Sequence, residues 1–141
     1  THLELEKLVY LCYADYLCAT KRQLFKDRIF AFKYGPVVES VYEEYKGTKE
    51  IEDSHDDDTH LEDYATMPAR SRILFAEDGI DIISHIDLTL SRFSDLPAHK
   101  LVDITHVEGG PWDSVDKEKP YAEISDEVIL ENHIKEIELV G

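Results

Sequence analysis

The sequence predicts a single α+β domain that is predominantly helical, with about five or six helices and a small hairpin or short sheet. Three observations lead to this prediction. Apolar residues recur at helical spacing in several segments, the residues from 29 to 33 alternate instead, and no repeat or linker divides the chain of 141 residues. We therefore treat residues 1–141 as one domain, with a variable acidic loop at about 48–66.

The first helix is predicted over residues 3–19. One wide apolar stripe runs along this segment at spacings of three and four residues, through Leu5, Leu8, Val9, Cys12, Tyr16 and Ala19. Further tyrosines and leucines widen the stripe, so we expect this helix to be largely buried. Cys12 and Cys18 lie on different faces of it, too far apart for the roughly 5.5 Å Cα separation of a disulfide. We expect two buried thiols.

A strand and a turn are predicted next. Residues 29–33 alternate in the manner of a short strand, which Tyr34-Gly35-Pro36 ends. Gly35 can adopt a backbone conformation closed to other residues, and Pro36 fits the first turn of a helix. We therefore predict a helix over residues 36–46, with Gly47 as its C-terminal stop.

Residues 50–63 contain eight acidic residues and no Lys or Arg, which predicts a solvated loop. His55, Asp56, Asp57, Asp58 and His60 carry atom types that bind metals, but the loop lacks the EF-hand spacing and its glycine. We expect no metal there. Residues 67–77 leave two alternatives open, because Ile73 to Phe75 suit either a strand paired with 29–33 or part of a helix.

Helical patterns return from Gly79 onward. Asp78 is the predicted N-cap of a helix whose inward residues are Ile83, Ile86, Leu90 and Phe93. Ser94 and Asp95 are predicted to cap the next helix, which has Pro97 in its first turn, runs toward His106 and ends at Gly109-Gly110-Pro111. Ser125 is predicted to cap the last helix, whose inward stripe would be Leu130, Ile134 and Ile137.

The charge balance argues against several function classes. The chain has 15 Lys and Arg against 31 Asp and Glu, a net charge of −16, so no basic face for nucleic acid is expected. An acidic surface favours rapid capture of basic proteins, or it serves solubility alone. No apolar run approaches the roughly 20 residues that span a bilayer, so we expect no membrane contact and a cytoplasmic location.

The segment from Thr105 to Trp112 is the candidate for chemistry. His106 lies close in sequence to Glu108 and could act as a general base on water, in a small hydrolase. No G-x-S-x-G turn or cysteine-protease signature accompanies it, and no phosphate-binding glycine motif occurs, so no cofactor is expected. A His beside Gly, Pro and Trp at a helix end more often caps carbonyls or contacts a partner.

Three blocks, taken together, resemble a known family. They are LEKLVYLCY at residues 5–13, FAFKYGPVVESVY at 30–42 and LVDITHVEGGPW at 101–112. In this order they resemble the Panacea, or SocA-like, antitoxin family. The chain departs from the family pattern in two places: Gly109-Gly110 adds a residue before Pro-Trp, and the acidic segment 50–63 is a peculiarity of this chain.

The resemblance implies a mainly helical domain that neutralises a cognate protein toxin by direct contact. It also implies a second mode, in which the domain is an adaptor that presents the bound toxin to a protease. A phage-borne regulatory protein that binds host machinery is the remaining alternative. The residues expected to contact the partner come from the second and third blocks: Lys33, Tyr34, Gly35, Pro36, Tyr42, Thr105, His106, Glu108 and Trp112.

Overall fold

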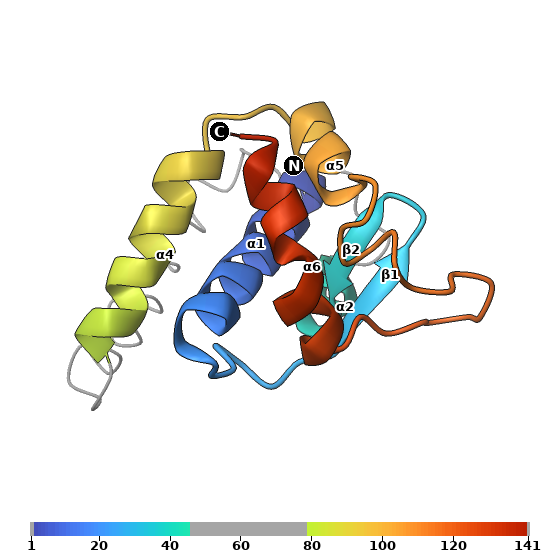
Figure 1. Ribbon diagram of the computed structural model, residues 1–141, viewed down its shortest axis with the longest axis horizontal. Coiled ribbons are helices and arrows are strands. Elements are labelled where there is room, and N and C mark those ends of the chain that lie inside the picture. The colour runs from blue at the N-terminus through green and yellow to red at the C-terminus, as the bar shows by residue number, and fades with distance from the viewer. Residues whose placement is uncertain (1, 46–78, 141) are drawn as a thin grey trace.

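The computed structural model describes residues 2–45 and 79–140 (Figure 1). This part of the chain contains five helices and a two-stranded antiparallel hairpin, which confirms the predicted fold class. The acidic segment, the His55–His60 stretch, Ile73–Phe75 and the expected cap at Asp78 lie outside the described residues. The elements in order are α1 (His2–Thr20), β1 (Ile29–Phe32), β2 (Gly35–Val38), α2 (Glu39–Tyr45), α4 (Gly79–Phe93), α5 (Ala98–Thr105) and α6 (Asp126–Glu138).

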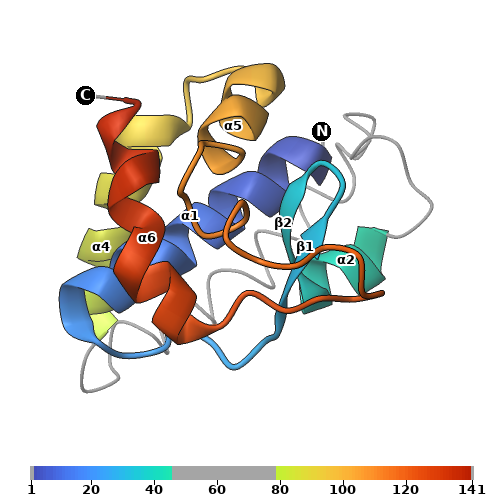
Figure 2. The same ribbon diagram turned by 45° about the vertical axis from the view of Figure 1, so that its right-hand side comes forward.

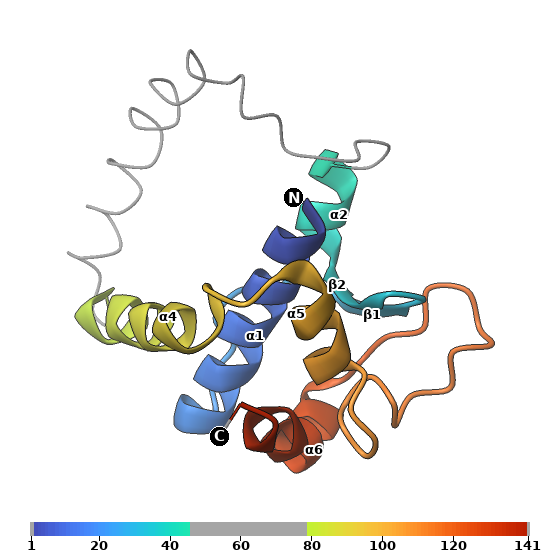
Figure 3. The ribbon, with the colours of Figure 1, turned by 90° about the horizontal axis from the view of Figure 1, so that it is seen from above.

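Helix α1 forms the centre of the domain, as its wide apolar stripe predicts. Seen from above, it runs through the middle of the molecule, with α4 on one side and α5, α6 and the hairpin on the other (Figure 3). Tyr10, Leu11 and Ala14 are fully buried in the core that these elements share. Both cysteines are free thiols on this helix; Cys12 is buried, whereas Cys18 is half-buried.

The hairpin corrects one sequence prediction. Its register pairs Ile29 with Val38 and Phe32 with Gly35, so only Lys33 and Tyr34 form the turn. Residues 36–38 were expected to open a helix, but they belong to β2, and α2 begins at Glu39. The physical reason is that the positive φ of Gly35, 114°, follows the two-residue turn and directs the chain back along β1.

The other edge of β1 is also paired. The backbone N–H of Ala31 donates to the Ala122 carbonyl (2.7 Å), and that of Ile124 donates to the Ile29 carbonyl (2.8 Å). The chain that follows α5 therefore passes alongside β1 (Figure 2). β2 and residues 122–124 therefore occupy the two edges of β1.

Helix α5 begins at Ala98, later than capping by Ser94 and Asp95 would place its start. Its N-cap is Pro97, which has an extended backbone (φ −69°, ψ 161°) and makes no side-chain cap hydrogen bond. The N–H groups of Lys100 and Leu101 donate to the Pro97 carbonyl, so capping by Ser94 and Asp95 was wrong. Proline suits this place because it needs no N–H bond of its own.

Helix α6 begins as predicted but buries a different face. The N–H of Val128 donates to Ser125 Oγ at 3.3 Å, which confirms Ser125 as the N-cap. The predicted inward stripe was wrong, because Leu130 is 38% exposed and Ile134 is 53% exposed. Ile137 is half-buried. The residues that face the core are Ile129, His133 and Glu136, all 0% exposed.

Candidate functional site

The three motif blocks meet around Gly35. We call this cluster the motif junction; it consists of Lys7, Gly35, Pro36, Thr105, His106 and Trp112. Lys7, from the first block, is buried and donates from Nζ to the Pro36 carbonyl at 2.9 Å. A Cβ on Gly35 would lie 2.9 Å from Thr105 Oγ1 and 3.0 Å from Lys7 Cε. The close contact and the positive φ together require glycine at this position.

His106 and Trp112 hold the end of β1 and the turn. The indole Nε1 of Trp112 donates to the Phe32 carbonyl at 2.6 Å. His106 Nε2 lies 3.1 Å from the Lys33 carbonyl oxygen, and His106 Nδ1 lies 2.8 Å from the Val102 carbonyl oxygen. The two rings pack with 3.9 Å between centroids. The third block therefore acts as a clamp on the backbone of the second.

The contacts of the His106 ring argue against its role as a general base. A general base needs a ring nitrogen directed at the proton that it removes. Both ring nitrogens of His106 are instead within hydrogen-bond distance of backbone carbonyls. A surface groove of about 480 Å³ lies at the start of α6 and is lined by other residues, among them Tyr13, Gln23, Glu123 and Asp126. The arrangement around His106 supports positioning of the hairpin.

The motif junction also buries a charge. Burial lowers the pKa of Lys7 to about 8, and the neighbouring carboxylate of Glu6 offsets only part of this effect. The amine tolerates this position because the Pro36 carbonyl accepts its hydrogen bond. Lys7 thus fixes β2 to α1 and is itself out of reach of a partner.

The residues expected to contact a partner divide into two groups. Gly35, Pro36 and Thr105 are buried, so they position the hairpin. The others reach the surface to different extents: Lys33 and Glu108 are exposed, Tyr34 is 60% exposed, and Tyr42, His106 and Trp112 are half-buried. We call Lys33, Tyr34 and the exposed part of the Trp112 side chain the hairpin-tip surface.

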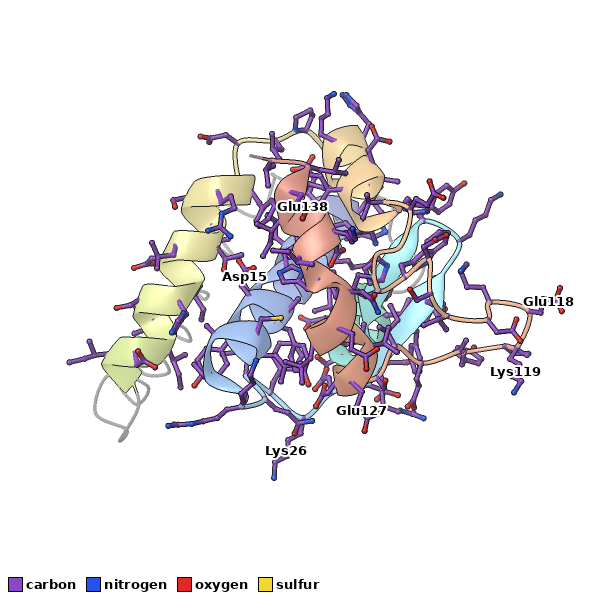
Figure 4. The ribbon with its side chains drawn as sticks, in the orientation of Figure 1. Asp15, Lys26, Glu118, Lys119, Glu127 and Glu138 are labelled. Atoms are coloured by element: carbon purple, nitrogen blue, oxygen red, sulfur yellow. The ribbon has the colours of Figure 1, made fainter. Side chains whose placement is uncertain are left out.

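A second cluster was not anticipated from the sequence. We call it the buried polar network; it consists of Tyr10, Asp15, Thr89, His133 and Glu136. His133 lies between two carboxylates, with Nε2 2.6 Å from Asp15 Oδ1 and Nδ1 2.8 Å from Glu136 Oε1. The Tyr10 hydroxyl donates to the same Glu136 oxygen, and the Thr89 hydroxyl donates to Asp15 Oδ2. These contacts join α1, α4 and α6, with Asp15 on the side of α1 that faces α4 (Figure 4).

The electrostatics of this network favour a charged histidine. Burial opposes the imidazolium, but the hydrogen bonds that its N–H groups donate to Asp15 and Glu136 outweigh this effect and raise the pKa of His133 to about 9. Burial also disfavours the Asp15 carboxylate, yet its bonds to His133 and Thr89 leave the pKa of Asp15 below its usual value. His133 is 0% exposed, so a substrate cannot reach its ring. The network therefore serves to hold the helices together.

Residues 2–45 and 79–140 contain neither a membrane-spanning helix nor a metal-binding cluster. Within these ranges no helix combines the length and apolar character needed to cross a bilayer. The same residues include no group of three His, Cys, Asp or Glu side chains arranged to hold a metal ion.

Comparison with known proteins supports the motif-based resemblance. Residues 5–113 match the family described as "Antitoxin SocA-like, Panacea domain". The chain is 30% identical over 117 residues to the antitoxin SocA of Caulobacter vibrioides (strain NA1000 / CB15N), a match that covers 82% of this chain. It spans only 59% of the length of that relative. No solved structure matches the chain. Because the family match includes all three motif blocks, the chain belongs to the SocA-like Panacea domain family of antitoxins.

Proposed function

We propose that this chain is the antitoxin of a bacterial toxin–antitoxin pair and neutralises a cognate protein toxin by direct binding. The main support is the structural role of the three motif blocks. Their buried members hold the hairpin against α1 and α5, and the turn residues Lys33 and Tyr34 remain exposed. Motifs that hold one turn at the surface are more consistent with recognition than with catalysis.

Rigidity of the hairpin tip favours tight binding. The carbonyls of Phe32 and Lys33 are engaged by Trp112 and His106, so the turn is ordered before any partner arrives. A preordered surface loses less conformational entropy on association. Tyrosine is also one of the residues that dominate binding hot spots, and Tyr34 is 60% exposed at the tip.

The charge of the chain favours a basic toxin. At a net charge of −16, long-range attraction accelerates encounter with a positively charged protein. Salt screens exposed charges over about 8–10 Å near physiological ionic strength. We therefore expect the association rate constant to fall as salt rises. A rate constant indifferent to salt would argue for a partner held by apolar contacts alone.

The decisive experiment identifies the partner and tests rescue. The tagged full chain is used to capture proteins from its native host, and each captured protein is expressed in a test bacterium with and without the chain. We expect one captured protein to arrest growth alone and to be harmless with the chain present. The proposal fails if no protein is retained and no product of a neighbouring gene is both toxic and rescued.

The same strains separate direct neutralisation from presentation to a protease in the cytoplasm. Direct binding predicts that rescue persists in a host that lacks its ATP-dependent proteases, with toxin levels unchanged. Adaptor action predicts that the toxin disappears when the chain is present and accumulates in the protease-deficient host.

A further inference from the structure

Tyr121 is an exposed aromatic residue beside the hairpin. It follows a segment between α5 and α6 that projects from the domain (Figure 1), with Glu118 and Lys119 at the far end (Figure 4). The Tyr121 ring meets the rings of Phe30 and Phe32 edge-on, with centroid distances of 5.5 Å and 5.8 Å. Tyr121 is nevertheless 59% exposed, so these contacts fix its position without burying it.

The backbone of Tyr121 is strained. Its φ is 53°, a left-handed value that a bulky aromatic residue rarely adopts. In the described ranges the other non-glycine residue with positive φ is Lys21, which follows the end of α1 directly, a usual place for this conformation. Tyr121 instead follows Pro120 in a turn, where glycine or asparagine would cost less.

Burial of the ring does not account for this strain. An aromatic side chain stabilises a fold mainly through the apolar area that it buries, and less than half of Tyr121 is buried. Its neighbour Phe30, by contrast, is only 3% exposed. A strained backbone that holds an aromatic ring mostly in water points to a use for the side chain at the surface.

Tyr121 adjoins the hairpin-tip surface and is held as firmly. Its ring packs on Phe32, the last residue of β1, which the turn of the hairpin follows directly. The residue after Tyr121 is fixed on β1, because the N–H of Ala31 donates to the Ala122 carbonyl at 2.7 Å. The ring is therefore in place before a partner arrives, and its use in binding costs little conformational entropy.

The exposed surface at Tyr121 is apolar, with charged residues around it. Pro120 and Tyr121 are both exposed and uncharged, and Lys119 and Glu123 are the nearest charged residues in the chain. The charge of Glu123 is already offset, because its Oε1 lies 3.7 Å from the Arg28 guanidinium. An apolar centre with a polar rim is the usual arrangement of a protein interface, and tyrosines at such centres fill pockets of the partner.

We infer that Tyr121 is a second anchor of the toxin-binding surface and that its ring enters an apolar pocket of the toxin. This inference rests on the proposed function and adds an apolar contact to the charge attraction that brings the two proteins together. The toxin-binding surface then extends from the turn of the hairpin, past Phe32, to Tyr121.

The test compares three variants of the full chain in binding to the captured protein that arrests growth. Tyr121→Asn removes the ring and suits the left-handed backbone, so its dissociation constant should rise about 10-fold or more. Tyr121→Phe keeps the ring and should bind within about 2-fold of the unchanged chain. Lys21→Asn is the matched control: it makes the same change at the other left-handed residue, at the end of α1 that lies away from the hairpin (Figure 1), and should also bind within about 2-fold.

Salt dependence and stability test the apolar contact and the strain separately. An apolar contact predicts the same loss of affinity for Tyr121→Asn at about 0.05 M and about 0.5 M salt. The thermal midpoint of Tyr121→Asn should be unchanged or higher, because relief of the left-handed strain offsets the lost ring contacts. A loss of affinity that disappears at high salt, or a midpoint that falls by more than about 3 °C, would overturn the inference.

The failure of this inference is distinguishable from failure of the proposed function. If the unchanged chain rescues growth from its toxin and Tyr121→Asn binds that toxin with full affinity, the second anchor is wrong and the antitoxin proposal stands. The same conclusion follows if Lys21→Asn weakens binding as much as Tyr121→Asn. If the unchanged chain rescues growth from no protein, the antitoxin proposal fails, and the second anchor fails with it.

Discussion

The motif junction and the buried polar network solve the same structural problem in different ways. Both connect distant segments to α1, and both bury ionisable side chains. In the motif junction, side chains such as Lys7 and Trp112 bind backbone carbonyls of the hairpin. In the buried polar network, side chains bind side chains, with His133 between Asp15 and Glu136. The first arrangement fixes the path of the backbone, whereas the second fixes how α1, α4 and α6 pack.

This difference has a functional meaning. The motif junction adjoins the exposed turn residues Lys33 and Tyr34 and holds them at the surface. The network is closed, with His133 and Glu136 both 0% exposed. Changes in the network should therefore act on stability alone, whereas changes at the edge of the motif junction should act on partner binding.

The largest expected effect is that of His133→Ala. Removal of the imidazolium leaves the buried Glu136 carboxylate without its charged partner, whereas Asp15 keeps the Arg92 guanidinium 3.5 Å from its Oδ2. The loss at Glu136 should cost about 3–5 kcal/mol of unfolding free energy. Urea denaturation measures the loss. Ile134→Ala is the control on the next residue of α6; it is 53% exposed and should change stability by about 0.5 kcal/mol or less. Similar losses for the two variants would contradict the role given to the network.

The second effect tests the close packing of the motif junction. Gly35→Ala combines a positive φ of 114° with a Cβ 2.9 Å from Thr105 Oγ1, and should cost about 2–4 kcal/mol. Gly109→Ala is the matched control, since its φ is 79° but its Cβ would meet nothing closer than Lys135 Cγ at 3.9 Å. This control should cost about 1–2 kcal/mol, from backbone strain alone. Equal costs would show that the space around Gly35 is not limiting.

A smaller effect is expected from Trp112→Phe. This change removes the N–H that donates to the Phe32 carbonyl and retains most of the ring that packs on His106. Loss of one such hydrogen bond should cost about 1–2 kcal/mol. Amide hydrogen exchange measures where the cost appears: we expect faster exchange in the hairpin and unchanged exchange in α4. Faster exchange in α4 would show that the motif junction and the buried polar network are coupled, which contradicts their separate roles.

The smallest effect is a pH dependence of opposite sign in the two clusters. The pKa of His133 rises from 6.5 to about 9 on folding, so its stabilisation is complete below pH 6.5 and is lost as the pH rises toward 9. The pKa of Lys7 falls from 10.5 to about 8, so the unfolded chain holds more protons between these values and stability due to Lys7 rises with pH there.

Substitution of each residue allows the two opposite pH dependences to be measured. The destabilisation caused by His133→Ala should shrink by about 1 kcal/mol between pH 7 and 8, and that caused by Lys7→Met should grow by about 1 kcal/mol between pH 8 and 9. Denaturant titrations of both variants and the unchanged chain at each pH supply the differences. Parallel pH profiles for the two variants would contradict the assignment of charge.

The helices could be predicted from sequence because their signals are local. Apolar periodicity was sufficient for α1 and α4, and the side chain of Ser125 marked the start of α6. The second strand was missed because Pro36 suits a helix start as well as a strand. The β-branched Val37 and Val38 were the signal for a strand, and they are buried in β2.

The buried face of α6 could not be predicted in the same way. Periodicity favours the apolar residues Leu130 and Ile134 as the inward side, yet the structure buries His133 and Glu136. Their partners Asp15 and Tyr10 are 118 and 126 residues away in the chain, so no local pattern indicates that these polar groups can be satisfied. The motif junction was partly predictable, because its residues stand in recognisable blocks, but the backbone contacts between the blocks required the structure.

If the hairpin-tip surface binds the toxin and the buried polar network only supports the fold, exposed residues of the two regions should respond differently to mutation. The most direct test is the dissociation constant of the captured toxin for Tyr34→Ala, compared with that for Ile134→Ala, an exposed apolar residue on α6. We expect Tyr34→Ala to weaken binding about 10-fold or more with an unchanged thermal midpoint, and Ile134→Ala to leave both unchanged. Full toxin affinity in Tyr34→Ala would contradict the account.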